Sequence, residues 1–281
     1  MKTAVVTDST AYLTEDERAR YNIRMVPLSV NLEDGTYEEE VTITASEFYE
    51  KVRNAKAFPK TTQPPVGKFV ELFEELSKDY DEIVTIHLSS GISGTYQGAV
   101  QAGDMVDNID VYAFDSEVAC SVQGMFVIEA AKMAEQGASA KEILAKLDDL
   151  KESMDAYFIV DDLAHLQRGG RLSAAAALIG GLLQVKPILH FVDTKIVPFE
   201  KIRTRKKALR RVEELIAAAV ENYGSLQATV IHSNCEEEGQ AWMAQLQKDY
   251  PTVDFTFSYF GPVIATHLGE GALALGWMKK E

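Results

Sequence analysis

Along the first half of the chain, short apolar runs alternate with longer stretches whose apolar residues repeat at helical spacing. The short runs are typical of strands buried on both faces; they occupy residues 4–7, 83–86 and 111–114, with a further β-prone run at 24–30. The helical stretches occupy residues 45–52, 66–76, 95–106, 119–136 and 143–150. Strands that alternate with helices predict a parallel sheet with helices on both faces. The acidic, turn-like residues 33–40 are expected to lie in solvent.

The second half begins with a strand at 156–160 and then changes character. Two β-prone runs, 187–192 and 196–199, flank Asp193-Thr194-Lys195 and predict a hairpin, which introduces an antiparallel part. The other expected elements are a small-residue helix at 174–183, an amphipathic helix ending near residue 223, a helix at 241–246 and strands at 229–231, 255–258 and 272–278. The pattern therefore predicts an α/β protein whose sheet architecture differs between its halves.

A polar stretch of sequence LSSGISGTYQ, residues 88–97, joins the strand at 83–86 to the following helix. Open α/β sheets bind ligands at such carboxyl ends of strands. Gly91 and Gly94 let the backbone approach a ligand, and Ser93 adds a hydroxyl beside a helix N-terminus that favours anions. Two interpretations stand at this point: an anion site, or a helix cap whose serines only satisfy the helix's own N–H groups.

Two other polar segments present candidate side chains. Asp8 follows the strand at 4–7 and is expected to cap the next turn. Three prolines within residues 58–65 force an extended path. That path either presents Thr61 and Thr62 from a stiff loop or leaves their hydroxyls bonded to their own backbone.

Arginine and histidine supply the cationic candidates. Arg171 follows two glycines, and its guanidinium suits a carboxylate or a phosphate, or alternatively a salt bridge across a domain boundary. Residues 201–211 hold seven basic residues, which is typical either of a solvated helix face or of a docking or phosphate-facing patch. His267 lies among glycines beside Thr266, and its imidazole is able to donate to an anion.

Composition narrows the class of protein. The chain has 281 residues, of which 46% are hydrophobic, so it is long enough for two domains or one large one with a full core. The formal net charge of −15 argues against general nucleic-acid binding. Cys120 and Cys235 form neither a disulfide framework nor a zinc site and fit a reducing cytosol. The N-terminus is too polar for a signal peptide, and no apolar run reaches the length of a membrane span, so we expect a cytoplasmic location.

The sequence lacks the familiar catalytic and cofactor motifs. It has no Walker phosphate loop, no dinucleotide fingerprint after the first strand and no histidine spacing that makes a metal site, so neither metal nor cofactor is expected. Ser93 and His267 are candidates for the nucleophile and base of a serine hydrolase. Residues 91–95, however, do not form the Gly-x-Ser-x-Gly elbow, and no evident carboxylate orients His267.

Five motifs together resemble the DegV family, in the family's order and across nearly the whole chain. They are Thr7-Asp8-Ser9-Thr10, Thr61-Thr62-Gln63-Pro64, Ser89 to Gln97, Gly169-Gly170-Arg171, and Gly261-Pro262 with His267-Leu268-Gly269. Members of this family resemble bacterial fatty-acid-binding proteins, and some serve as the FakB subunit of fatty acid kinase. Residues 160–163 and 203–208 are similar to that kinase-linked branch.

The resemblance implies an α/β fold of two domains with the ligand between them. An N-terminal parallel-sheet domain is expected over residues 1–157 and a C-terminal mixed-sheet domain over residues 158–281. The implied ligand is a long-chain fatty acid whose acyl chain enters an apolar tunnel, lined by helices such as 119–136 and 174–183. Burial of that chain must supply most of the affinity, at roughly 0.8 kcal/mol per methylene.

The resemblance also implies a role for particular residues. The fatty acid carboxylate is expected to meet Thr61 or Thr62, Ser93, Gly94 and His267. Arg171 and Arg203 match arginines tied to phosphoryl transfer or to contact with the kinase. Two departures stand near this site: Ala265 where many members carry glycine, and Glu270 where many carry proline, which adds negative charge near the carboxylate groups.

The sequence thus predicts a carrier that is not an enzyme alone. Its expected partners are the fatty acid and an ATP-dependent fatty acid kinase subunit, with transient membrane contact but no membrane span, and no nucleic acid. Two alternatives stay open: a Ser/His lipid esterase, and a binder of a small anionic metabolite. Chain length, unsaturation and oligomeric state are left undetermined.

Overall fold

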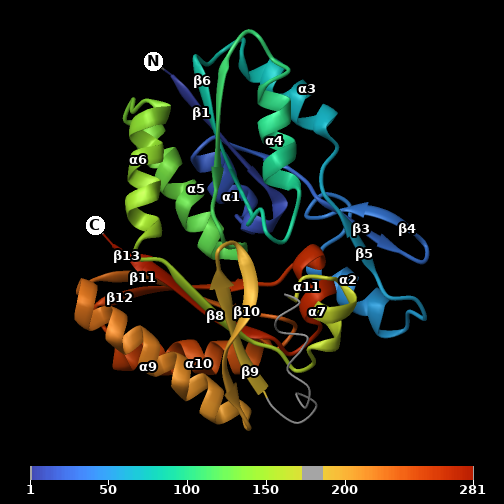
Figure 1. Ribbon diagram of the computed structural model, residues 1–281, viewed down its shortest axis with the longest axis vertical. Coiled ribbons are helices and arrows are strands. Elements are labelled where there is room, and N and C mark those ends of the chain that lie inside the picture. Colours follow the sequence, from blue (N-terminus) through green and yellow to red (C-terminus); the bar gives the residue numbers. More distant parts are fainter. Residues whose placement is uncertain (1, 173–185, 281) are drawn as a thin grey trace.

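A four-stranded parallel sheet organises the N-terminal lobe of the computed structural model, which describes residues 2–172 and 186–280. Its strands run in the order β2 (Ile23–Val26), β1 (Thr3–Asp8), β6 (Glu82–His87) and β7 (Asp110–Asp115). Between β1 and β2 lie η1 (Ser9–Ala11) and α1 (Glu15–Arg20). One face is covered by α3 (Val66–Leu76) and α4 (Thr95–Gly103), the other by α5 (Cys120–Glu135) and α6 (Ala140–Lys151) (Figure 1).

Burial on both faces explains why these strands read as continuous apolar runs. Successive side chains of a strand point to opposite faces. In β1, Val6 packs in one cluster with Phe69 and Phe73 of α3, whereas Val5 packs in another with Phe126 of α5. The predicted parallel sheet with helices on both faces is therefore confirmed.

The C-terminal lobe is built on a six-stranded mixed sheet, as predicted. The strand order is β10 (Lys195–Ile202), β9 (Lys186–Val192), β8 (Asp155–Ile159), β13 (Leu273–Lys279), β11 (Leu226–His232) and β12 (Val253–Tyr259). The pairing is parallel only between β11 and β12 among the described strands of this sheet. The hairpin expected around Asp193-Thr194 is confirmed as β9 and β10. The domain boundary predicted after residue 157 falls inside β8, and it stays a prediction.

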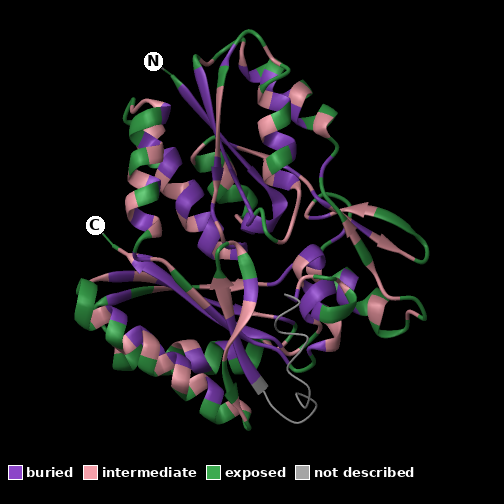
Figure 2. Cartoon of the chain, viewed as in Figure 1, coloured by how far each residue is buried: buried purple, intermediate pink, exposed green. Residues whose placement is uncertain are grey.

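The two faces of the mixed sheet have different neighbours. Helices α9 (Arg205–Tyr223) and α10 (Glu236–Asp249) cover the outer face, where Tyr157 and Ile159 of β8 pack. Phe158, which alternates with them, joins the cluster that contains Phe126 of the N-terminal lobe. Figure 2 shows this buried strip continuing from one lobe into the other. The junction between the lobes is therefore hydrophobic core.

Three short elements flank this junction on one side (Figure 1). They are α2 (Ala45–Arg53), α7 (Ala164–Arg168) and α11 (Pro262–Leu268). Helix α11 contacts both α7 and α2, and it also contacts a small antiparallel sheet of the order β4 (Gly35–Glu38), β3 (Ser29–Leu32) and β5 (Lys60–Thr62).

This small sheet corrects two expectations from the sequence. The β-prone run at 24–30 is two strands in different sheets, because Pro27 between β2 and β3 has no N–H for a ladder. Residues 33–40 are only in part the solvated turn that was expected: residues 33–36 are exposed and 33–34 form a turn, but β4 lies within the segment and Glu39 is fully buried. The segment with three prolines is extended, as predicted, but Thr61 pairs with Val30 in a sheet rather than lying in a loop.

The small-residue helix expected at 174–183 lies outside the described residues. Within the part of the chain that the structure describes, no helix is both long enough and apolar enough to cross a membrane.

Candidate functional site

A cavity of about 310 Å³ lies between the two lobes, and most of its wall is apolar. This volume is about twenty times what one buried water molecule requires. The N-terminal end of α5 contributes Cys120 and Val122, and the hairpin contributes Phe191 and Ile196. The remaining apolar wall includes Leu28, Leu88, Ala119, Phe158, Phe260, Val263 and Leu268.

Alternate residues of the neighbouring strands β8 and β13 form one wall of the cavity. Ala156 and Phe158 of β8 lie opposite Gly276 and Ala274 of β13, so all four point to the same face of the sheet. A Cβ on Gly276 would lie 2.3 Å from a methyl group of Val122, so only glycine permits helix α5 to pack this closely. The sequence predicted a strand at 156–160, but not which of its faces would line a cavity.

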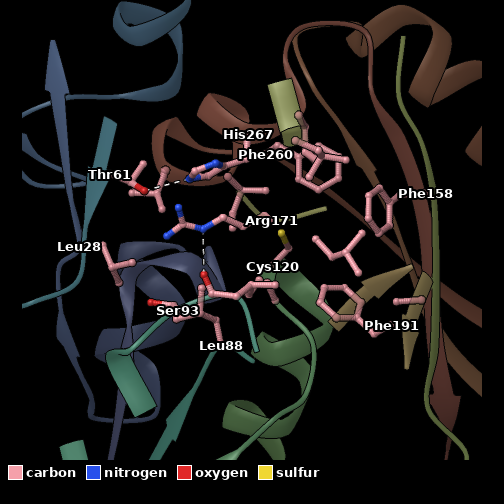
Figure 3. Close-up of a pocket in the computed structure, with 18 of the residues that line it drawn as sticks. Leu28, Thr61, Leu88, Ser93, Cys120, Phe158, Arg171, Phe191, Phe260 and His267 are labelled. Atoms are coloured by element: carbon pink, nitrogen blue, oxygen red, sulfur yellow. Dashed lines mark hydrogen bonds between the residues drawn. The ribbon is translucent and has the colours of Figure 1, made fainter. Parts of the chain in front are cut away.

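The polar side chains of the cavity gather at one place, shown in Figure 3. All of the residues predicted for a carboxylate site line this cavity, although they come from β5, the turn before α4, and α11; they are Thr61, Thr62, Ser93, Gly94 and His267. Arg171 and Gln63 line it as well. Arg203 does not: it is exposed between β10 and the start of α9.

His267 is held as a neutral imidazole. Its Nε2 and the Thr61 hydroxyl are 2.9 Å apart in a hydrogen bond. Burial lowers the pKa of His267 to about 3, and the charge of Arg171 and the neighbouring His165 add to the effect. Its Nδ1 has no hydrogen-bond partner among the described residues. A Cβ on Gly169 would lie 2.1 Å from that nitrogen, so the glycine makes room for the ring.

The turn after β6 places Ser93 and Gly94 at the start of α4. The Ser93 hydroxyl lies 2.8 Å from the Thr95 hydroxyl and accepts a hydrogen bond from the Thr95 N–H at 3.3 Å. Ser93 thus satisfies one free N–H group of α4, although the N-cap position itself is Gly94 and has no side-chain cap, and its position in the cavity wall is compatible with a second role. A Cβ on Gly94 would lie 2.0 Å from Oε1 of Gln63, so this close approach needs glycine.

Asp8 fixes the start of this turn through hydrogen bonds. Its Oδ1 accepts from the Thr10 N–H at 3.0 Å, which confirms the predicted cap. Its Oδ2 accepts from the Leu88 N–H at 3.0 Å and lies 2.9 Å from Nδ1 of His87. Both side chains are fully buried. Asp8 thus fixes the carboxyl end of β6, where the turn with Ser93 begins.

Arg171 connects the two lobes at the polar end of the cavity, where Thr61, Ser93 and His267 also lie. Its Nε donates to the carbonyl oxygen of Ile92 at 3.1 Å, and its Nη1 donates to that of Gly169 at 2.6 Å. Its partners among the described residues are therefore carbonyl oxygens rather than the carboxylate of a salt bridge. Burial lowers the pKa of the guanidinium, which carries five N–H donors, of which these bonds use two. Arg171 is the only residue with a full charge among the described residues of the wall.

Other charges expected near the site lie elsewhere. Glu270 pairs with Arg53 at 3.0 Å and does not line the cavity, so it does not place its charge beside the carboxylate groups. In the basic segment 201–211, Arg205 pairs with Glu238 at 2.6 Å, and Arg211 pairs with Glu200 at 2.8 Å. That segment leaves exposed basic side chains at Lys201, Arg203, Lys206 and Lys207.

The hairpin is a part of the site that sequence reasoning missed. Its tip sits on the turn after β6, where the Ser89 hydroxyl donates to the Thr194 carbonyl at 2.6 Å. A Cβ on Gly91 would lie 2.3 Å from the same oxygen. The sequence signalled a hairpin and a glycine-rich turn separately, and only the fold brings them together.

Together these features give the cavity two chemically different parts. Hydroxyls, one neutral imidazole and one guanidinium lie at its polar end, and the rest of the wall is apolar, an arrangement that suits an anionic head and a hydrophobic tail. A hydrolytic triad is not assembled among the described residues, because Ser93 bonds Thr95 while His267 bonds Thr61 and has no orienting carboxylate.

The chain belongs to the DegV family. The family's model, described as "Uncharacterised protein, DegV family", matches residues 2–280. Protein DegV of Bacillus subtilis is 53% identical over 281 residues and covers 100% of both chains. The fold is similar to the crystal structure of DegV, a fatty acid binding protein from Bacillus subtilis, with a TM-score of 0.95, 52% identity and 100% of each chain covered. It is also similar to a fatty-acid-binding DegV family protein from Thermus thermophilus, with a TM-score of 0.93, 32% identity and 100% of each chain covered.

Proposed function

We propose that this protein binds one long-chain fatty acid in the cavity between its lobes and presents the carboxyl group to an ATP-dependent fatty acid kinase. The observation that carries the proposal is the distribution of polar groups in the cavity. They gather at one end of an otherwise apolar space. Two relatives with the same fold are described as fatty-acid-binding proteins, which supports this ligand class.

The tail supplies most of the affinity in this proposal. Each buried methylene contributes roughly 0.8 kcal/mol, so a long chain offsets the cost of association and ordering. The wall formed by Phe158, Phe191 and Phe260 gives the chain an apolar surface to contact. A small hydrophilic anion would bury none of that apolar surface, which disfavours the alternative of an anionic metabolite.

The head is held by a modest set of donors. We assign the carboxylate to the Thr61–His267 pair, Thr62, Ser93 and the backbone at Gly94. A neutral imidazole with a pKa of about 3 offers one N–H and no net charge. Arg171 adds a guanidinium at the same polar end of the cavity.

Transfer to a kinase requires a surface for that partner. We propose that the exposed basic residues of the segment 201–211, including Arg203, meet the kinase, and that the protein acts as a substrate-carrying subunit rather than an enzyme by itself. The free thiols Cys120 and Cys235 fit the cytoplasmic location that such a subunit needs.

The ligand is tested by extraction. Protein purified from a bacterial host is denatured in organic solvent, and the extract is analysed by mass spectrometry. We expect one long-chain fatty acid per chain, and a reduced amount from Ser93→Ala and His267→Ala, because each loses a hydrogen bond to a charged acceptor worth about 1.5–3 kcal/mol. An extract without acyl chains, from protein that also binds none on titration, would contradict the proposal.

The kinase is tested by separating binding from turnover. Arg203→Ala is expected to leave fatty-acid affinity within twofold of the parent, because Arg203 does not line the cavity, while acyl-phosphate formation with a reconstituted kinase falls at least tenfold. Lys141→Ala, which removes an exposed lysine of α6, is the matched control. Unchanged turnover with Arg203→Ala would remove this arginine from the kinase surface.

A further inference from the structure

Glu39 is a buried carboxyl group that reaches from the N-terminal lobe to the helix that carries His267. It follows β4 and is 0% exposed. Its Oε1 accepts hydrogen bonds from the backbone N–H of Val263 at 2.7 Å and from the hydroxyl of Tyr12 at 3.1 Å. The hydroxyl of Ser9 lies 2.6 Å from its Oε2. Glu39 thus joins α11 to the segment after β1.

The contact with Val263 completes the N-terminal end of α11. The first N–H groups of a helix have no partner within the helix. Gly261 at the N-cap has no side chain to offer, and Pro262 has no N–H, so Val263 bears the first free donor. Glu39 accepts from it as an N-cap side chain normally would, but from a distant part of the chain. A Cβ on Gly261 would lie 3.1 Å from Oε1 of Glu39 and 2.4 Å from the Tyr12 ring, so glycine permits the approach.

The position of Val263 affects the position of His267, which lies one helical turn later. Residues four apart in a helix lie on one face, one turn above the other, and both Val263 and His267 line the cavity. Helix α11 has only seven residues, so a shift of its first turn is carried to His267. We propose that Glu39 is a positioning residue that fixes the start of α11 and thereby holds His267 at the polar end of the cavity. This inference rests on the proposed function for its consequence in binding.

A buried carboxyl group without a cation is costly, and such groups concentrate at functional sites. Glu39 has no ion pair among the described residues. Burial raises its pKa to about 8, and the charge of Glu40 acts in the same direction, while the hydrogen bonds from Ser9, Val263 and Tyr12 oppose it. The surrounding titratable and charged groups are Tyr12, Arg18, Glu40, Cys120 and Tyr259. A hydrocarbon side chain would fill this space without that cost, but it would leave the Val263 N–H without an acceptor.

The test reads His267 directly and without ligand. In the parent, NMR titration of the ligand-free protein should show a His267 ring that stays neutral down to pH 5, with the resonance assigned by His267→Gln. In Glu39→Ala we expect this ring to become protonated with a midpoint above pH 5, because a displaced imidazole gains contact with water. Glu39→Gln keeps an acceptor for Val263 and a donor for Ser9, so it should restore the parent titration.

The second measurement is fatty-acid affinity. We expect Glu39→Ala to weaken binding about tenfold, which is the loss of one well-placed hydrogen bond, and Glu39→Gln to stay within twofold. In a His267→Gln background, Glu39→Ala should add almost nothing, because residues that act through one another are not additive. Glu40→Ala is the control: Glu40 lies next in the chain, accepts from Tyr259 at 2.8 Å, and should leave His267 unchanged.

The outcomes separate the two proposals. An unchanged His267 titration in Glu39→Ala, or a full loss of affinity that persists in the His267→Gln background, would overturn the positioning role. A parent protein that binds no fatty acid would overturn the proposed function and leave the titration as the test of Glu39. If Glu39→Ala does not fold, Glu39→Asp takes its place, because it keeps the carboxyl group but withdraws it by one methylene.

Discussion

At the scale of single residues, the geometry of the site depends on groups that pack closely against three glycines. Gly94, Gly169 and Gly276 each stand where a Cβ would meet another group within 2.3 Å. These glycines are therefore required by packing rather than by backbone conformation, because their φ angles lie outside the left-handed region. At Gly94 and Gly169 the neighbour is polar, Gln63 and His267 respectively, whereas at Gly276 it is a methyl group of Val122.

Gly169→Ala tests this at the ring of His267. The added methyl would lie 2.1 Å from Nδ1 of His267, so the imidazole has to leave the position in which it bonds Thr61. We expect fatty-acid affinity to fall about tenfold, the loss of one hydrogen bond to a charged acceptor. Gly67→Ala is the matched control: a Cβ there has nothing within 4 Å, and alanine should stabilise helix α3 by about 0.5–1 kcal/mol. Isothermal titration and urea unfolding measure the two effects, and an unaffected Gly169→Ala variant would contradict this packing.

His267 also predicts a pH dependence of stability. Its pKa is lowered from 6.5 to about 3 in the folded protein, so between these values the unfolded chain binds the proton and the folded chain does not. The free energy of unfolding should therefore fall as pH decreases below 6.5, by up to about 1.4 kcal/mol per pH unit from this group. His267→Gln removes this contribution, so the stability gap between parent and variant should narrow from pH 7 to pH 5. Urea unfolding at both values measures it, and a constant gap would show that His267 titrates normally.

At the scale of elements, the hairpin β9–β10 links the sheet of one lobe to the turn of the other. Phe191 and Ile196 line the cavity, and the tip carbonyl of Thr194 accepts from Ser89. The tip residues Asp193 and Thr194 have φ angles of 47° and 70°, as in a two-residue turn of type I′. A β-branched residue is strained at such an angle, and here the strain lies beside the site.

Relief of that strain gives a prediction about the hairpin. Thr194→Gly should raise the free energy of unfolding by about 0.5–1 kcal/mol, because glycine adopts the positive φ without penalty and keeps the backbone carbonyl that Ser89 uses. Gly137→Ala is the reciprocal control: its φ is 85° with open space around it, so strain alone should destabilise the variant by about 1 kcal/mol. Chemical denaturation compares both with the parent. A destabilised Thr194→Gly variant would show that the threonine side chain contributes more than its strain costs.

At the scale of the whole molecule, one hydrophobic cluster continues through both lobes. Phe126 of the N-terminal lobe and Phe158 of the mixed sheet belong to the same cluster, and the cavity lies inside it. A ligand in that cavity contacts both lobes at once. Its occupancy should therefore stabilise the chain as one unit.

Ligand addition tests this coupling. Protein stripped of lipid and then saturated with a fatty acid at 100 times its Kd should gain about 2.7 kcal/mol of stability. Hydrogen exchange should slow in both the N-terminal turn after β6 and the hairpin β9–β10, because both line the cavity. His267→Ala at the same ligand concentration should gain less, in proportion to its weaker binding. Protection confined to one lobe would contradict a site shared by both.

The sequence by itself determined the local elements and the family. The patterns of apolar residues predicted the parallel sheet and the hairpin, because side-chain direction follows from chain geometry alone. Motifs at Thr61, Ser93, Arg171 and His267 could be named together because the resemblance covered nearly the whole chain. Their assembly around one apolar cavity is a property of the structure.

Tertiary structure decided what depends on contacts between distant segments. The burial of Glu39 was invisible in an acidic stretch, because the groups that donate hydrogen bonds to its carboxyl oxygens belong to Ser9, Tyr12 and Val263, which are distant in the sequence. The neutral state of His267 likewise follows from its enclosure, and the separation of Arg203 from the cavity follows from the path of β10. Local pattern records which way a side chain points along its own element. Burial, pKa and proximity arise only when other elements close around it.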